Sequence, residues 1–151
     1  LSDNEKEIIS GLSLDSKLWE LKSLLFHKLN KIGRARTEEE IQFLKKDLEP
    51  VINSLEIPSN KTGLSYLFNH LKGAYYFGIQ DNKNSLDTVL ATIKLLEENP
   101  NNFGDEPNIL VSNLANAIYL SIKNGNIDKA QQLYTKLKLL FELHKENGSK
   151  D

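Results

Sequence analysis

Histidine is the residue type in this chain best suited to acid–base chemistry or metal binding, and three are present: His27, His70 and His144. They fall in three separate segments, and none belongs to a His-Glu-x-x-His motif. No Glu stands three residues before a His, which is the spacing of carboxylate-bridged di-iron bundles. Glu142 lies two residues before His144, so the two side chains would not share a helix face. The sequence therefore predicts no metal site.

The other residue patterns that support catalysis are missing as well. The chain has no cysteine, which excludes disulfides, thiolate catalysis and cysteine-ligated zinc. It contains no Gly-x-x-x-x-Gly-Lys, Gly-x-Gly-x-x-Gly or Gly-x-Ser-x-Gly, the patterns of phosphate cradles and of the serine elbow. We therefore expect no cofactor, no catalytic residues and no enzymatic activity.

Charge and hydropathy also limit the partners. The net charge is −2, from 19 basic and 21 acidic residues that are mixed along the chain. The densest basic stretch, 28–36, runs directly into the acidic run 38–40, which is typical of a solvated corner and not of a nucleic-acid-binding stripe. The apolar runs are far shorter than the roughly 20 residues of a membrane span. We expect a soluble protein, with the cytoplasm slightly favoured, no nucleic-acid partner and no membrane span. The absent starting Met indicates a processed or cropped chain, so a removed signal peptide stays open.

Apolar residues recur every three or four positions through most of the chain, as in Leu18, Leu21 and Leu25. This spacing predicts six main helices over 15–32, 37–55, 63–79, 85–98, 107–123 and 127–145, with a short helical turn at 4–10 before them. Thr37 with Glu40 forms a capping box, and Asn84 or Ser85 is predicted to cap the fourth helix. Trp19 lies beside the Leu18/Leu21 stripe and is predicted to pack in the core or between helices.

The lengths of the breaks predict how these helices are arranged. Short corners alternate with longer loops, which favours an all-α fold of stacked antiparallel helical hairpins, an α-solenoid. The hairpins would cover about 14–56, 62–99 and 106–146 of a single helical-repeat domain spanning 1–151, itself a fragment of a longer chain. A shift of 44 residues aligns the last two hairpins, for example 93–98 with 137–142.

The segment from Gly125 to Tyr134, with Ala130 between them, resembles the corner and second helix of a tetratricopeptide repeat. That family places a Gly at the corner, a small residue five positions on and an aromatic residue four positions after that. The resemblance is best over 113–140 and loose over 64–100. Leu86 and Leu90 depart from the pattern, and the repeat is about ten residues longer than usual, with the excess around Pro100 to Pro107.

The resemblance implies a non-catalytic scaffold that binds a protein or peptide in a groove lined by the first helix of each hairpin. The residues placed there are Phe68, Lys72, Tyr76, Ser112, Asn116, Tyr119 and Lys123. Asn116 is the amide expected to hold the backbone of a bound peptide. The alternative for these residues is a solvated helix face with one or two packing tyrosines. A ligand-sensing regulatory domain with a closed pocket, coupled to an effector outside this chain, is the alternative function. Self-association through the terminal hairpins also stays open, because the last helix carries many apolar residues.

Overall fold

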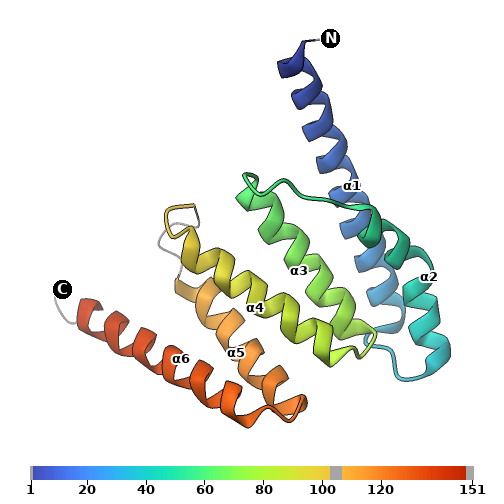
Figure 1. Ribbon diagram of the computed structural model, residues 1–151. Helices are drawn as coiled ribbons and strands as arrows, with labels where there is room; N and C mark the ends of the chain where they lie inside the picture. Colours follow the sequence, from blue (N-terminus) through green and yellow to red (C-terminus); the bar gives the residue numbers. More distant parts are fainter. Residues whose placement is uncertain (1, 103–106, 149–151) are drawn as a thin grey trace. The chain divides into compact units, whose positions relative to one another are not determined.

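The computed structural model describes residues 2–102 and 107–148, and in these ranges the chain is all-helical, with six helices and no strand (Figure 1). The helices are α1 (Asp3–Ile32), α2 (Glu38–Ser54), α3 (Thr62–Gly78), α4 (Asn82–Glu98), α5 (Pro107–Lys123) and α6 (Ile127–Gly148). The chain divides into two compact units, Leu1–Asp81 with α1 to α3 and Asn82–Asp151 with α4 to α6. This division falls inside the predicted hairpin 62–99. No described helix is both long and apolar enough to cross a bilayer.

The all-α fold class is confirmed, and two predictions about helix starts are corrected. α1 is one continuous helix from Asp3, where two pieces at 4–10 and 15–32 were expected. Ser2 caps it by accepting a hydrogen bond from the Glu5 backbone N–H at 3.1 Å. An internal glycine such as Gly11 costs a helix only about 1 kcal/mol, which a long helix tolerates. α4 begins at Asn82, so Asn84 and Ser85 lie inside the helix and do not cap it.

In the first unit, α1, α2 and α3 pack on one another around a leucine-rich core that includes Leu21, Leu25 and Leu44. The predicted capping box forms at the start of α2, where Thr37 Oγ1 accepts from the Glu40 N–H at 3.2 Å. Glu40 reaches back to the Arg36 N–H, also at 3.2 Å, one residue before the cap.

The corner between α1 and α2 is docked on the C-terminal end of α3. The Ala35 N–H donates to the carbonyl of Gly78 at 2.8 Å, and Arg34 Nε donates to the carbonyl of Phe77 at 3.0 Å. Gln80, at a φ of 62°, donates its side-chain amide back to the Ala35 carbonyl. The carbonyls of Phe77 and Gly78 lie in the last turn of α3, where the helix offers them no N–H of its own, and the three bonds together fix the helices of this unit to one another.

In the second unit, α5 packs against both α4 and α6, and consecutive helices run antiparallel (Figure 1). The corner between α5 and α6 uses Gly125 at a φ of 75°, as predicted for a helix C-terminus. Asn126 caps α6 by accepting from the Lys129 N–H at 3.1 Å. Asn124 donates to the carbonyl of Asn82 at 3.0 Å, which ties this corner to the start of α4.

The helices recur at a spacing close to the shift of 44 residues found in the sequence. α3 and α5 begin 45 residues apart, at 62 and 107, and so do α4 and α6, at 82 and 127. α3, α4 and α5 have 17 residues each.

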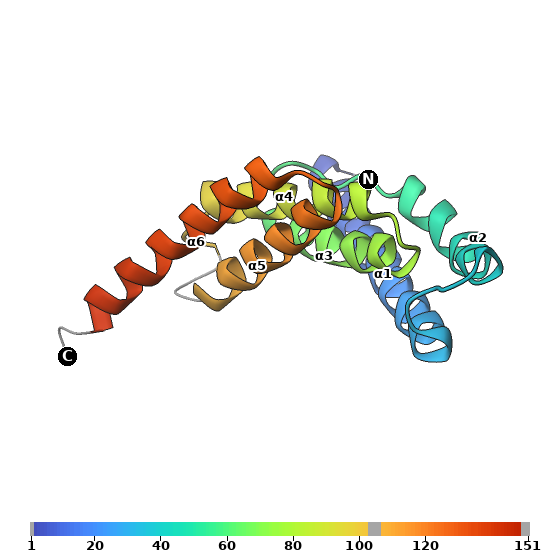
Figure 2. The same ribbon diagram turned by 90° about the horizontal axis from the view of Figure 1, so that it is seen from below.

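Two helices extend beyond the partners that they pack against within their own units. The N-terminal half of α1 projects past α2 and α3 (Figure 1), and the C-terminal end of α6 projects past α5 (Figure 2). Trp19 is 67% exposed, so the prediction that it packs in the core or between helices was wrong. Its position, one residue after the buried Leu18, turns its ring away from α2 and α3.

The last helix has exposed apolar residues along its projecting end. Leu137 and Leu140 pack on the core of the second unit, as their spacing predicts. Leu139, Phe141 and Leu143 are each more than half exposed. The self-association that such an end could cause stays a prediction.

Candidate functional site

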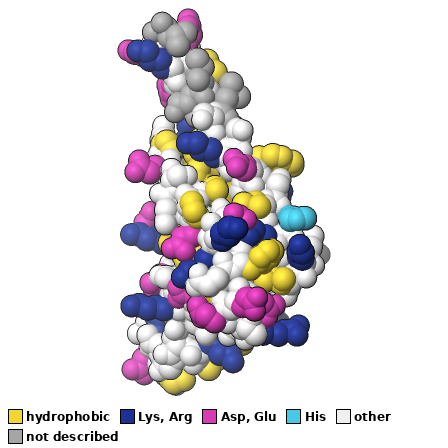
Figure 3. Space-filling model, turned by 90° about the vertical axis from the view of Figure 1, so that its right-hand side faces the viewer, with side chains coloured by type: hydrophobic (Ala, Val, Ile, Leu, Met, Phe, Trp, Pro, Cys, Tyr) yellow, Lys and Arg dark blue, Asp and Glu magenta, His cyan; other side chains and the backbone are white. Residues whose placement is uncertain are grey.

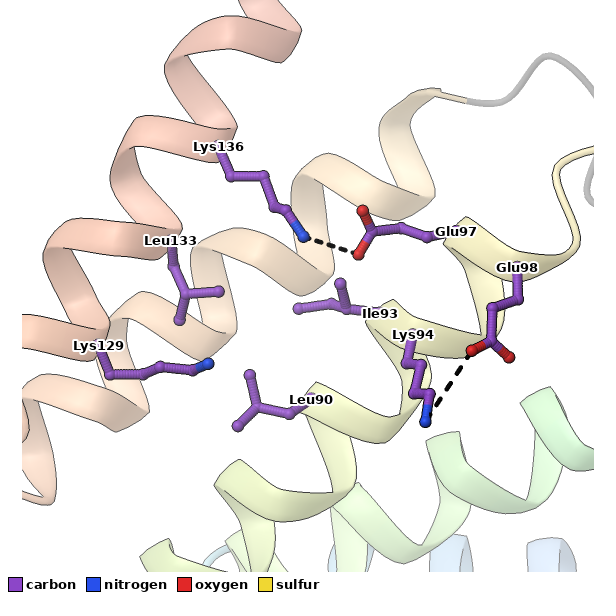
Figure 4. Close-up of a pocket in the computed structure, with 8 residues that line it drawn as sticks. All are labelled: Leu90, Ile93, Lys94, Glu97, Glu98, Lys129, Leu133 and Lys136. Atoms are coloured by element: carbon purple, nitrogen blue, oxygen red, sulfur yellow. Dashed lines mark hydrogen bonds and ion pairs between the residues drawn. The ribbon is translucent and has the colours of Figure 1, made fainter.

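A groove runs between α4 and α6 in the second unit, and it is open to solvent (Figure 4). Its volume is about 360 Å³. The α4–α6 groove is lined by Leu90, Ile93, Lys94, Glu97, Glu98, Lys129, Leu133 and Lys136. Ile93 and Leu133 are buried at its base, and half-buried Leu90 extends this apolar floor. The three apolar residues belong to the stripes that pack α4 and α6 onto α5, so the floor of the groove is the outer margin of the core.

Charged side chains form the rim of the groove. Lys136 Nζ lies 2.8 Å from Glu97 Oε1, in an ion pair that joins α6 to α4. Lys94 and Glu98, one turn apart on α4, lie 3.9 Å apart. Lys129 points from α6 into the space between the helices, and no described residue forms an ion pair with it (Figure 4). The groove therefore combines an apolar floor with a rim that carries one more positive than negative charge.

The structure places the four predicted residues of α5 together on one exposed face. Ser112, Asn116, Tyr119 and Lys123 are all exposed, and Lys123 Nζ lies 5.5 Å from the centre of the Tyr119 ring. Their spacing of four, three and four residues puts them in one row along the helix. These side chains do not pack in the core. Their exposure agrees equally with a partner-binding face and with a solvated helix face.

The three predicted residues of α3 are placed differently. Phe68 is 8% exposed and belongs to the core of the first unit, so its ring serves packing and does not line an open surface. Lys72 covers that ring, with Nζ 4.6 Å from its centre, and desolvation lowers the pKa of its ammonium group. Tyr76 is half-buried, and burial, followed by Asp81 and Glu49, raises the pKa of its hydroxyl. The α3 and α5 residues belong to different units.

The charged rim of the α4–α6 groove is not among the residues predicted from the sequence. The apolar spacing predicts Leu90 and Ile93 of α4 and Leu133 of α6 as core residues, and they do pack on the core of the second unit. Lys129 and Lys136 on α6, and Lys94 on α4, flank those stripes at helical spacing. This flanking pattern was the available signal, but it identifies a groove only once α4 and α6 are known to lie on the same side of α5.

Other parts of the described surface give less evidence of a functional site. Within the described residues, no group of three His, Asp or Glu side chains could hold a metal ion. A second open groove, of about 320 Å³, lies between Leu14 and Lys17 of α1 and the segment from Ser54 to Pro58. On the face seen from the α2 side, basic and acidic side chains are interspersed (Figure 3).

Comparisons with known proteins give no relative from which a function could be transferred. No protein-family model matches the chain, and neither curated proteins nor solved structures give a significant match.

Proposed function

We propose that the chain is a non-catalytic binding module that holds a segment of another protein in the α4–α6 groove. The observation that carries this proposal is the combination of a buried apolar floor with a charged rim in an open groove. Peptide-binding surfaces use apolar pockets for affinity and surrounding polar groups for orientation and specificity.

The resemblance of 113–140 to a tetratricopeptide repeat also favours a scaffold, although that family would place the partner along α3 and α5. Within the second unit, the α4–α6 groove offers a concave apolar surface, whereas the α5 row from Ser112 to Lys123 is an exposed helix face. We therefore place the primary contact in the groove.

The test is an affinity capture from cells of the native organism with the wild type and three double variants. Lys94→Glu/Lys129→Glu reverses two charges of the groove rim. Lys83→Glu/Lys138→Glu is the matched control, because it reverses two exposed lysines on the same helices that do not line the groove. Asn116→Ala/Lys123→Glu alters the α5 face.

A partner that the wild type, the control and the α5 variant retain, and the rim variant loses, supports the proposal. A partner lost only with Asn116→Ala/Lys123→Glu would move the binding site to α5. Retention by all four proteins would contradict both locations.

A further inference from the structure

The kind of segment that fits the α4–α6 groove can be argued from the backbone that surrounds it. All eight lining residues lie within helices, so their backbone N–H and C=O groups are bonded along the helix or to its cap, apart from the carbonyls of Glu97 and Glu98 in the last turn of α4. An extended peptide binds best where an exposed strand edge offers it unpaired backbone groups. This groove offers Lys and Glu side chains instead. An α-helix satisfies its own backbone hydrogen bonds, so it can bind in a groove that is lined mainly by side chains and not by free backbone groups.

The arrangement of the helices also favours a helical partner. Within the described residues, α4 and α6 both pack on α5, while their own backbones stay apart and meet only through side chains such as Glu97 and Lys136. Two helices held apart over a third leave a channel between them, and the side-chain ridges of a further helix can fill it. The floor consists of Leu90 and Ile93 from one side and Leu133 from the other. A row of apolar side chains at i, i+3, i+4 and i+7 on a partner helix can pack on an apolar floor of this kind.

The charges of the rim then specify the polar side of the partner. Glu97 is paired with Lys136, and Glu98 with Lys94, so both carboxylates of the rim are engaged. Lys129 is the cation left over, and no described residue pairs with it. Its side chain lies along the apolar floor next to Leu90 (Figure 4). An Asp or Glu on the partner would meet an unpaired ammonium group there, in surroundings partly shielded from water.

We infer that the occupant of the α4–α6 groove is an amphipathic α-helix of a partner protein that carries a carboxylate facing Lys129. The inference rests on the proposed function, since it names the partner of the same groove. It commits to an acidic amphipathic helix over an extended peptide, a small ligand or a second copy of this chain.

The experiment is a selection from two display libraries on the full chain. One library contains amphipathic helices with a fixed apolar stripe and randomised flanks. The other contains random linear peptides interrupted by proline, which cannot form a helix. Each selection is run on the wild type, on Lys129→Glu and on the control Lys138→Glu. Binding is mapped by the NMR signals of Leu90, Ile93 and Leu133.

The expected result is a set of helices that perturb these three residues and carry Asp or Glu at one position. Changing that residue to Lys should weaken binding to the wild type roughly tenfold. Selection on Lys129→Glu should enrich Lys or Arg at the same position, and selection on Lys138→Glu should again give acidic helices.

The other outcomes distinguish a failure of this inference from a failure of the proposed binding function. Groove binding by proline-containing peptides alone would overturn the helical partner and leave the proposed function standing. Groove-binding helices with no charge preference, or with one that does not switch on Lys129→Glu, would overturn the role of Lys129. A wild-type dimer that Lys129→Glu dissociates, seen by sedimentation, would replace the partner protein with a second copy. The absence of any clone that perturbs the groove would contradict both proposals.

Discussion

Lys28 of α1 and Asp47 of α2 form a direct ion pair, with Nζ of the lysine 2.8 Å from Oδ2 of the aspartate. Lys28 is 4% exposed, and its ammonium group also donates to the carbonyl of Phe43 and lies 4.1 Å from the centre of the Phe43 ring. The buried cation thus has a carboxylate, a carbonyl and an aromatic face around it. These three contacts offset the loss of water from the ammonium group and help to join α1 to α2.

The first prediction concerns the pH dependence that this pair gives to stability. The hydrogen bond from Lys28 lowers the pKa of Asp47 below its ordinary value of 3.8. Because the pKa is lowered in the folded chain, the carboxylate adds stability that is fully present above 3.8. This contribution is lost as the pH falls through the lower folded value. Wild type should therefore be more stable than Asp47→Asn at neutral pH, and the gap should close below 3.8.

The measurement is urea unfolding followed by the amide signals of α1 and α2 at several pH values. Lys28→Met serves as a control that keeps the apolar stem and removes the charge, and its stability should not share this acid-dependent loss. A gap between wild type and Asp47→Asn that stays constant from neutral pH to well below 3.8 would show that the pair does not couple to protonation.

The second prediction concerns the close packing of α3 on α1 and α2 at Gly78. A Cβ built at this position would lie 3.1 Å from Cδ2 of Leu29 and 3.5 Å from Cδ1 of Leu44. Gly78→Ala should change the free energy of unfolding by less than about 1 kcal/mol, because better helix propensity offsets a contact that the tip of Leu29 can relieve. Gly78→Leu should destabilise by about 1–3 kcal/mol or more through overpacking. Equal stability of the two variants in urea titrations would mean that the helices separate easily here.

The course of the helices was largely predictable from the sequence, because apolar periodicity is a local property of each segment. The capping box at Thr37 and the glycine corner at Gly125 were predictable for the same reason. The start of α4 was not, because Asp81, which precedes the helix, and Asn84 both belong to residue types that commonly cap a helix, and the sequence does not decide between them. The break predicted within α1 is absent, because a single glycine weakens a helix without ending it.

Burial and the groove were harder to predict because they depend on which helices are neighbours. Periodicity shows that Leu18 and Leu21 face a core, but whether Trp19 beside them is covered depends on where α2 and α3 end. Phe68 likewise shares the α3 row with Lys72 and Tyr76, yet it lies in the core of its unit. The rim pair Glu97–Lys136 joins residues that are far apart in the chain, and its existence requires α4 and α6 to lie on the same side of α5.

The third prediction concerns the hydroxyl of Ser121, which is fully buried in α5 and has no hydrogen-bond partner among the described residues. A buried polar atom without a partner is costly, and alanine is the better helix former. Ser121→Ala should therefore stabilise the second unit by roughly 0.5–1.5 kcal/mol.

Ser112→Ala is the matched control for this change. Ser112 lies on the exposed face of the same helix, so its replacement alters helix propensity alone, by about 0.5 kcal/mol or less. Thermal unfolding of both variants gives the comparison. Loss of stability in Ser121→Ala would reveal a hydrogen bond to the hydroxyl, for example from a buried water molecule.

The fourth prediction uses Trp19, which is the only tryptophan of the chain and 67% exposed. Its fluorescence should be quenched by iodide nearly as well in the folded chain as in urea, because the ring is open to solvent in both states. Trp19→Ala should change the free energy of unfolding by no more than about 0.5 kcal/mol, as expected for a surface position. Lys22, whose Nζ lies 5.6 Å from the centre of the Trp19 ring, covers only part of it.

Quenching measured over a range of protein concentrations also tests self-association at this site. Protection that grows with concentration would mean that another copy covers Trp19, whereas protection at every dilution would place the ring against its own chain and contradict its exposure.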